Sequence, residues 1–204
     1  MPTRHLTYTN PHLKTSILTP KQFLSSQWAG GNSTQLYIFP DNASYAARNF
    51  ELRISTAKVE VEESTFTALP GIQRKLMILE GEISITHKGQ YSKHLKAFDV
   101  DNFSGDWKTT SLGTCTDFNV MTTRLKQSEL YHLAMGPTSS YCFKPKETCK
   151  NLFLYATSGT IHLKLMDINY VLETGNLMVI ENLNTSSISI NSAEAFGLAV
   201  VEIY

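Results

Sequence analysis

Arginine, carboxylate and amide side chains recur at alternate positions in strand-like runs of the chain, a pattern suited to binding a small polar ligand. Residues two apart on a β-strand point to the same face. Arg53 therefore shares a face with Ser55, and Asp117 shares one with Asn119. A guanidinium binds a carboxylate through two parallel hydrogen bonds. If these faces line a cavity, they predict recognition of a small ligand that bears a carboxylate or an amide.

The run 74–80 extends this pattern, because Arg74 and Glu80 fall on one face with two apolar residues between them. Two structural interpretations stay open beside the pocket. Arg53 can form an internal ion pair with Asp117 or Glu80, or the polar faces can be the solvated exterior of the fold. Of the two tryptophans, we assign Trp28 to the mouth of the pocket and Trp107 to the core.

The sequence predicts no metal, no cofactor and no catalytic residue. The six histidines include no His-x-His pair, and His87 and His94 are separated by a predicted turn, so a transition metal has no visible ligand set. There is no Gly-x-Ser-x-Gly nucleophile motif and no glycine-rich phosphate-binding motif. Binding without covalent or metal chemistry is the simplest expectation.

The composition argues against nucleic acid and membranes as partners. Eighteen basic and eighteen acidic side chains balance, so no overall field draws the protein to nucleic acid or to an anionic membrane. No apolar run approaches the roughly 18 residues that a membrane span needs. An odd number of cysteines (Cys115, Cys142 and Cys149) without CxxC spacing fits reduced thiols. We expect a cytoplasmic protein that binds neither nucleic acid nor membrane; the sequence leaves a homo-oligomer open.

Short runs rich in β-branched and aromatic residues alternate with turn residues, which predicts an all-β sandwich or barrel. A short helix is predicted to begin at Pro20, because Thr19 suits the N-cap and proline suits the first helical position. The stretch 144–151 is polar and is expected to be an exposed loop. The predicted strands are 35–39, 50–61, 75–79, 83–87, 118–122, 152–156, 160–166, 177–180, 187–190 and 197–203.

An ordered set of motifs between residues 17 and 124 resembles the HutD/Ves family of bacterial cupin-like proteins. The set comprises 28–35 (Trp-Ala-Gly-Gly-Asn-Ser-Thr-Gln), 53–57 (Arg-Ile-Ser-Thr-Ala), 70–71 (Pro-Gly) with Arg74, 79–81 (Leu-Glu-Gly), 103–107 (Phe-Ser-Gly-Asp-Trp) and 117–121 (Asp-Phe-Asn-Val-Met).

This resemblance implies two cupin-like double-stranded β-helix barrels in one compact chain. The first, residues 1–125, would carry the family motifs, and the second would span residues 126–204. It also places nine residues at motif positions as ligand-binding candidates: Trp28, Thr34, Gln35, Arg53, Ser55, Arg74, Glu80, Asp117 and Asn119. Gln35 stands where a glutamate is expected, which keeps the hydrogen-bonding shape and removes the charge.

Two functions follow for comparison with the structure. The first is a protein that binds a small carboxylate or acyl amino acid and has a regulatory or metabolite-sensing role. HutD proteins are associated with histidine-utilisation operons and Ves proteins with stress responses, so the resemblance implies one of these settings. The alternative is a metal-independent isomerase or hydrolase of a small metabolite, with Glu80 or Asp117 as the acid/base. A shifted carboxylate pKa inside a closed pocket would favour the enzyme.

Overall fold

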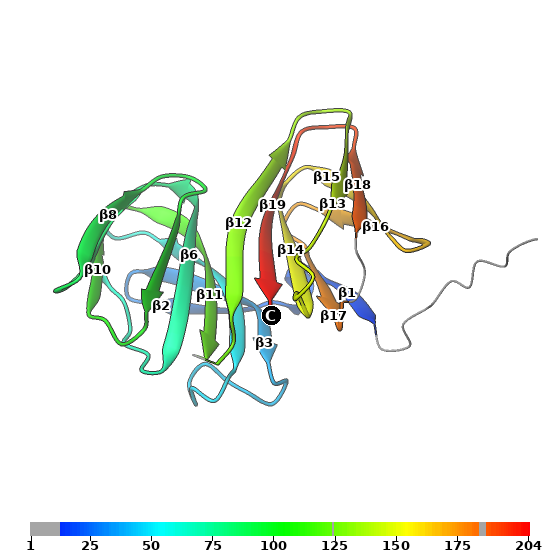
Figure 1. Cartoon of the computed structure of the whole chain (residues 1–204). Coiled ribbons are helices and arrows are strands. Elements are labelled where there is room, and N and C mark those ends of the chain that lie inside the picture. Colours follow the sequence, from blue (N-terminus) through cyan, green and yellow to red (C-terminus); the bar gives the residue numbers. More distant parts are fainter. Residues whose placement is uncertain (1–12, 124, 184–186) are drawn as a thin grey trace, which may run out of the picture.

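The computed structural model describes residues 13–123, 125–183 and 187–204, and these fold almost entirely into antiparallel strands. The strands form four sheets. Figure 1 shows them as two barrels side by side, each built from one larger and one smaller sheet. This confirms the prediction of an all-β, cupin-like fold with two modules.

The first barrel combines a six-stranded and a four-stranded sheet. The six strands lie in the order β2 (Leu24–Trp28), β3 (Gly31–Phe39), β4 (Leu52–Val59), β11 (Cys115–Thr123), β6 (Ile72–Gly81) and β9 (Val100–Ser104). The four lie in the order β5 (Glu63–Thr65), β10 (Thr109–Leu112), β7 (Ile83–His87) and β8 (Tyr91–Leu95).

The second barrel combines a five-stranded and a four-stranded sheet. The five strands lie in the order β1 (Lys14–Leu18), β17 (Leu177–Glu181), β14 (Asn151–Ser158), β19 (Phe196–Ile203) and β12 (Ser128–Met135). The four lie in the order β13 (Ser139–Phe143), β18 (Ile188–Ser192), β15 (Thr160–Leu165) and β16 (Ile168–Glu173). The division predicted near residue 125 falls between β11 and β12 and stays a prediction. Strand β1 precedes that point and nevertheless pairs with β17.

Each of the ten predicted runs overlaps a strand, and the structure adds strands that the sequence pattern did not reveal. All five residues of β2 are exposed, so this edge strand shows no hydrophobic alternation. Strand β12 is rich in residues that favour helices, and its pairing with β19 overrides that preference. The predicted helix after Thr19 is one 3₁₀ turn, Pro20–Gln22. The stretch 144–150 connects β13 to β14, as expected of a loop.

The two barrels meet through the apolar faces of their larger sheets. One buried cluster draws on both, with Ile54 and Phe118 from the first barrel and Phe153, Val179 and Val201 from the second. Strand alternation then directs the neighbours of Ile54 and Phe118 to the opposite face, toward the interior of the first barrel. The contact between the barrels therefore sets which side chains point inward.

The interiors of the two barrels differ in chemistry. Inside the second barrel, β14, β17 and β19 contribute apolar residues that include Leu154, Met178 and Leu198, all fully buried. In the first barrel, buried apolar clusters share the interior with two arginines, an aspartate and an asparagine. The second barrel also buries Glu202, whose carboxylate accepts hydrogen bonds from Tyr131, Tyr204 and the backbone of Lys146. Among the described residues, the buried side-chain atoms without partners lie in the first barrel.

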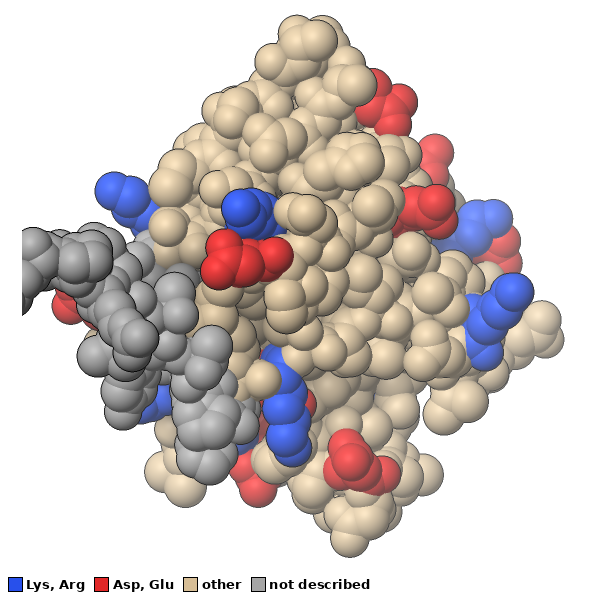
Figure 2. All heavy atoms as spheres, turned by 90° about the vertical axis from the view of Figure 1, so that its right-hand side faces the viewer, with Lys and Arg blue, Asp and Glu red and all other residues tan. Residues whose placement is uncertain are grey.

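The face of the second barrel in Figure 2 carries scattered charged side chains of both signs, and much of that surface carries neither. This distribution agrees with the overall charge balance. Within residues 13–123, 125–183 and 187–204, there is no helix of the length and hydropathy that a membrane span requires.

Weakening the contact between the barrels should lower the stability of the protein strongly. Leu52 is 3% exposed in the inter-barrel cluster, so Leu52→Ala should lower the free energy of unfolding by about 2–5 kcal/mol. The matched control, Leu125→Ala, changes a leucine that is 96% exposed and should stay within about 0.5 kcal/mol of wild type. Urea unfolding measures both. Equal stability of the two variants would contradict the interface described here.

Candidate functional site

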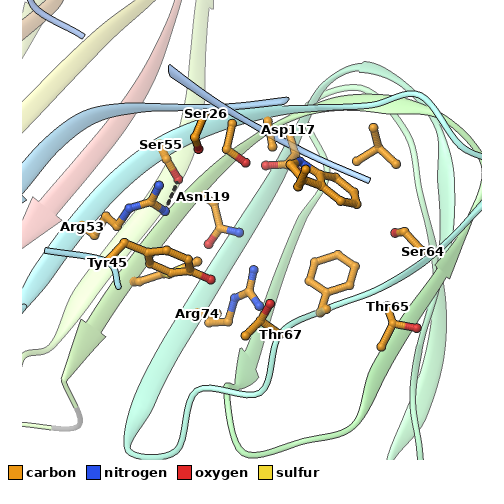
Figure 3. Close-up of a pocket in the computed structure, with 16 residues that line it drawn as sticks. Ser26, Tyr45, Arg53, Ser55, Ser64, Thr65, Thr67, Arg74, Asp117 and Asn119 are labelled. Carbon is orange, nitrogen blue, oxygen red and sulfur yellow. Dashed lines mark hydrogen bonds between the residues drawn. The ribbon is translucent and has the colours of Figure 1, made fainter. Parts of the chain in front are cut away.

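A cavity of about 240 Å³ lies inside the first barrel. It is smaller than the clefts of about 300–1,000 Å³ that hold drug-sized ligands, so it suits a small metabolite. Figure 3 shows the side chains around it. Its lining comprises Ser26, Trp28, Ser33, Tyr45, Arg53, Ser55, Ala57, Val59, Ser64, Thr65, Phe66, Thr67, Arg74, Asp117, Asn119 and Met121.

Arg53 on β4 is held by neutral groups. Its Nε donates to Oε1 of Gln35 at 3.0 Å, and one of its terminal nitrogens donates to Oγ of Ser55 at 2.9 Å (Figure 3). The ring of Tyr45 lies against the guanidinium, with its centroid 4.5 Å from Cζ. Burial lowers the pKa of Arg53. The guanidinium is thus oriented, and neither of its two hydrogen-bond partners neutralises its charge.

Arg74 on β6 lies across β11 from Arg53, since both arginines are opposite Met121 in the sheet. Its guanidinium carbon is 5.0 Å from the ring centroid of Phe66 and 5.1 Å from that of Phe103. Its Nε is buried and has no hydrogen-bond partner among the described residues. Burial lowers the pKa of Arg74 to about 10. This cation sits between aromatic rings with part of its hydrogen-bonding capacity unused.

Asp117 and Asn119 project into the same cavity from β11, the strand between those of the two arginines. The Oδ1 atom of each is buried without a hydrogen-bond partner in the described structure. Burial raises the pKa of Asp117 to about 7, although the charges of Arg74 and Arg53 act in the opposite direction. Unpaired buried polar atoms are uncommon in proteins, and at a cavity wall they are candidates for contact with a ligand.

The internal ion pair considered for Arg53 is not present. No ion pair joins Arg53 to Asp117 or to Glu80, all three of which are described residues. Gln35 and Ser55 orient the guanidinium instead, because both accept hydrogen bonds from it. The polar faces are also not the solvated exterior, since Arg53 and Asp117 are buried.

The structure brings together six of the nine predicted residues at the cavity wall: Trp28, Arg53, Ser55, Arg74, Asp117 and Asn119. Gln35 contacts the site through Arg53. Thr34 lies on the other face of β3, where its hydroxyl bonds Ser25 at 2.9 Å, because adjacent residues on a strand point to opposite sides.

Glu80 is outside the cavity and exposed, near the end of β6. A register shift makes Thr116 and Asp117 of β11 face Glu80 and Ile78 of β6, which skips one residue of β6. This bulge breaks the alternation that placed Glu80 on the face of Arg74.

Trp28 ends β2 at the hairpin that leads into β3, and its indole is 40% exposed beside the cavity. The hairpin needs glycine at Gly31, where φ is +148° and a Cβ atom would lie 1.9 Å from the carbonyl oxygen of Lys58. Trp107 instead packs against the rings of His87 and Tyr91, away from the cavity lining. Trp28 thus lines the cavity, and Trp107 is partly buried against a core cluster.

Sequence reasoning missed the aromatic part of the site. Tyr45 lies in the connection between β3 and β4, and Phe66 and Thr67 lie between β5 and β6. Residues in connections have no strand periodicity, so no alternation rule assigns them a face. One available signal was the conjunction of aromatic residues with two inward-facing arginines, because guanidinium groups pack on aromatic faces.

Histidines and acidic residues do not converge on the cavity. Among the described residues, no group of three or more His, Cys, Asp or Glu side chains could hold a metal ion. His87 is buried and bonds Asp101 at 2.9 Å and Thr109 at 2.8 Å, in a network behind the cavity lining. The titratable lining residues of the cavity are Tyr45, Arg53, Arg74 and Asp117.

Solved structures share this fold. The chain is similar to the conserved protein of unknown function PA5104 from Pseudomonas aeruginosa PAO1, with 20% identity over 93% of this chain and 98% of that chain and a TM-score of 0.80. It is similar to HutD from Pseudomonas fluorescens SBW25, with 15% identity over 93% of this chain and 99% of that chain and a TM-score of 0.67. It is also similar to the bacterial pirin YhhW from Escherichia coli, solved in complex with nickel(II). The identity is 11% over 93% of this chain and 98% of that chain, and the TM-score is 0.67.

Sequence comparison identifies the family. Among curated proteins, none matches the chain. The family model of HutD matches residues 20–197, which include strands of both barrels and every residue of the cavity lining. The chain belongs to the HutD family.

Proposed function

We propose that the protein binds a small carboxylate, acyl amino acids included, in the cavity of its first barrel. The observation that carries this proposal is the pair of buried guanidinium groups at the cavity wall, Arg53 and Arg74, neither of which has a carboxylate partner among the residues that the structure describes. Burying an uncompensated charge is costly, by several kcal/mol per ion. A bound carboxylate would supply the missing counter-charge.

The charges of the cavity favour an anion. Arg53 and Arg74 contribute two positive charges, and Asp117 contributes at most one negative charge. The site therefore has a net positive charge before a ligand binds. Gln35 contributes to this result, because a neutral amide rather than a carboxylate accepts the Nε hydrogen bond of Arg53.

The remaining groups suit an acylated amino group next to the carboxylate. Asn119 Oδ1 and Asp117 Oδ1 are acceptors without donors, so an amide N–H of the ligand would satisfy one of them. The rings of Tyr45 and Phe66 provide apolar surface for an acyl group or a short carbon chain. Figure 3 shows Asn119 between the two guanidinium groups, where it can bond the middle of a ligand held at Arg53 or Arg74.

The role that we propose is regulatory or metabolite-sensing. A site with no metal cluster and no nucleophile–base pair among its lining residues favours reversible binding over turnover. Membership of the HutD family supports a link to histidine utilisation; the resemblance to Ves proteins would instead suggest a stress response.

Replacing Arg53 by lysine should weaken carboxylate binding markedly. Lysine keeps the charge but cannot form two parallel hydrogen bonds with a carboxylate, and a lost charge-assisted hydrogen bond corresponds to about 1.5–3 kcal/mol. The measurement is a thermal-shift screen of small carboxylates, with formylated and acylated amino acids, on wild type and Arg53→Lys. The control is Arg48→Lys, since Arg48 is exposed and absent from the lining. A ligand that stabilises all three proteins equally would show that Arg53 is structural.

Arg74→Met should separate binding from stability. Methionine replaces an incompletely paired buried cation by an apolar chain, so the free energy of unfolding should stay the same or rise by up to about 4 kcal/mol. Carboxylate binding should be lost. Urea unfolding and the same ligand screen measure the two effects, with Arg48→Met as the exposed control. If Arg74→Met unfolds the ligand-free protein more easily than wild type, the guanidinium serves the fold rather than a ligand.

One observation favours the alternative, a metal-independent enzyme. Asp117 is buried in the cavity with its pKa raised to about 7, where a carboxyl group can act as acid or base. Glu80, the other candidate acid/base, is exposed outside the cavity.

The two functions differ in the fate of the ligand. A carboxylate that stabilises the protein should be recovered unchanged after prolonged incubation with it, as followed by proton NMR. Conversion of the ligand by wild type, with loss of conversion but not of binding in Asp117→Asn, would establish the enzyme instead.

A further inference from the structure

We propose that Asp117 makes the cavity take up a proton together with its anionic ligand. The ionised carboxylate of Asp117 repels a ligand carboxylate bound at Arg53 and Arg74, whereas its protonated form removes that repulsion and offers an O–H donor. This inference rests on the proposed function and adds a regulatory property to the same site.

The geometry supports a competition for the two cations. Asp117 projects from β11, between β4 with Arg53 and β6 with Arg74, and all three side chains line one cavity. No ion pair joins Asp117 to either arginine. Asp117 is 4% exposed, and its Oδ1 has no hydrogen-bond partner among the described residues. A carboxylate in this position is largely removed from bulk solvent and has no fixed protein donor at Oδ1 to stabilise its charge.

No other group around Asp117 is placed to take over this role. The charged side chains that face it are Arg53 from β4 and Arg74 from β6; Tyr45 lies against Arg53. On its own strand, burial and the charge of Asp117 raise the pKa of Cys115 to about 12, so the thiol stays neutral. The lining residues of β2, β3 and β5 are Ser26, Trp28, Ser33, Ser64 and Thr65, and none of them carries a charge.

The sign of the effect follows from linkage. With its pKa near 7 in the empty cavity, Asp117 is largely ionised at about pH 8. A bound anion nearby raises that pKa further, because a second negative charge disfavours ionisation. Binding then draws in a proton, and affinity falls as pH rises. The loss approaches about tenfold per pH unit when one full proton is taken up.

The test compares wild type with Asp117→Asn, which has nearly the same shape and cannot ionise. Formate, acetate and N-acetylglycine are titrated by calorimetry between about pH 6 and about pH 8.5, in two buffers with different heats of protonation. Wild type should bind more weakly as pH rises and take up close to one proton at the upper end. Asp117→Asn should show neither effect and should bind up to about tenfold more tightly than wild type at about pH 8. Asp167→Asn, an exposed matched control with an 87% exposed side chain, should behave as wild type.

A ligand-free measurement keeps this inference separate from the proposed function. Because the pKa of Asp117 is raised in the folded state, its ionisation destabilises the fold; this loss begins above the ordinary aspartate range of about pH 4 and is complete above about pH 7. Asp117→Asn should therefore have a higher Tm than wild type at about pH 8, and the difference should shrink as the pH falls towards about 4.

If wild type binds carboxylates with an affinity that does not change with pH, the proposal of proton uptake is overturned and the proposal of carboxylate binding stands. An Asp117→Asn variant whose Tm is no higher than that of wild type at about pH 8 also overturns it. No saturable binding of any of the three probes contradicts both proposals.

Discussion

Two large sheets meet along their apolar faces, and β4, β6 and β11 contribute to one of these faces. Each strand has only two faces, so packing Ile54 and Phe118 against the second barrel directs Arg53 and Asp117 into the first. A one-residue slip in register would exchange the two sets and bury charges between the barrels. The apolar contact between the barrels and the polar lining of the cavity therefore both depend on the register of the same strands.

The stability of the second barrel offsets the cost of burying polar groups in the first. Its interior is mainly apolar, which contributes hydrophobic stabilisation. Its buried carboxylate, Glu202, accepts hydrogen bonds from Tyr131, Tyr204 and the backbone N–H of Lys146. The first barrel holds the orphaned atoms of Arg74, Asp117 and Asn119. Because native proteins are stable by only about 5–15 kcal/mol, a site with this much buried, unsatisfied polarity needs such support. Among the described residues, the buried polar atoms without partners belong to side chains of the first barrel, beside the cavity.

Much of this could be predicted from the sequence, and the failures have identifiable causes. Alternation correctly paired Arg53 with Ser55 and Asp117 with Asn119, because the period of a strand is fixed. It failed for Glu80, since a bulge changes the count within β6 and cannot be read from residue types. Tyr45 lies in a connection whose path depends on the packed fold. The hydrogen bonds of Arg53 depend on side-chain reach, which spacing alone does not specify.

Strand β1 has a consequence for the order in which the molecule can be completed. Its pairing partner β17 lies at residues 177–181, so the hydrogen bonds of β1 wait until most of the chain has been synthesised. The strands of the first barrel, β2 to β11, lie within residues 24–123 and can pair earlier. Without β1, the outer edge of β17 would expose unpaired backbone groups, which invite pairing with another chain. Strand β1 thus covers one edge of the sheet that is completed last.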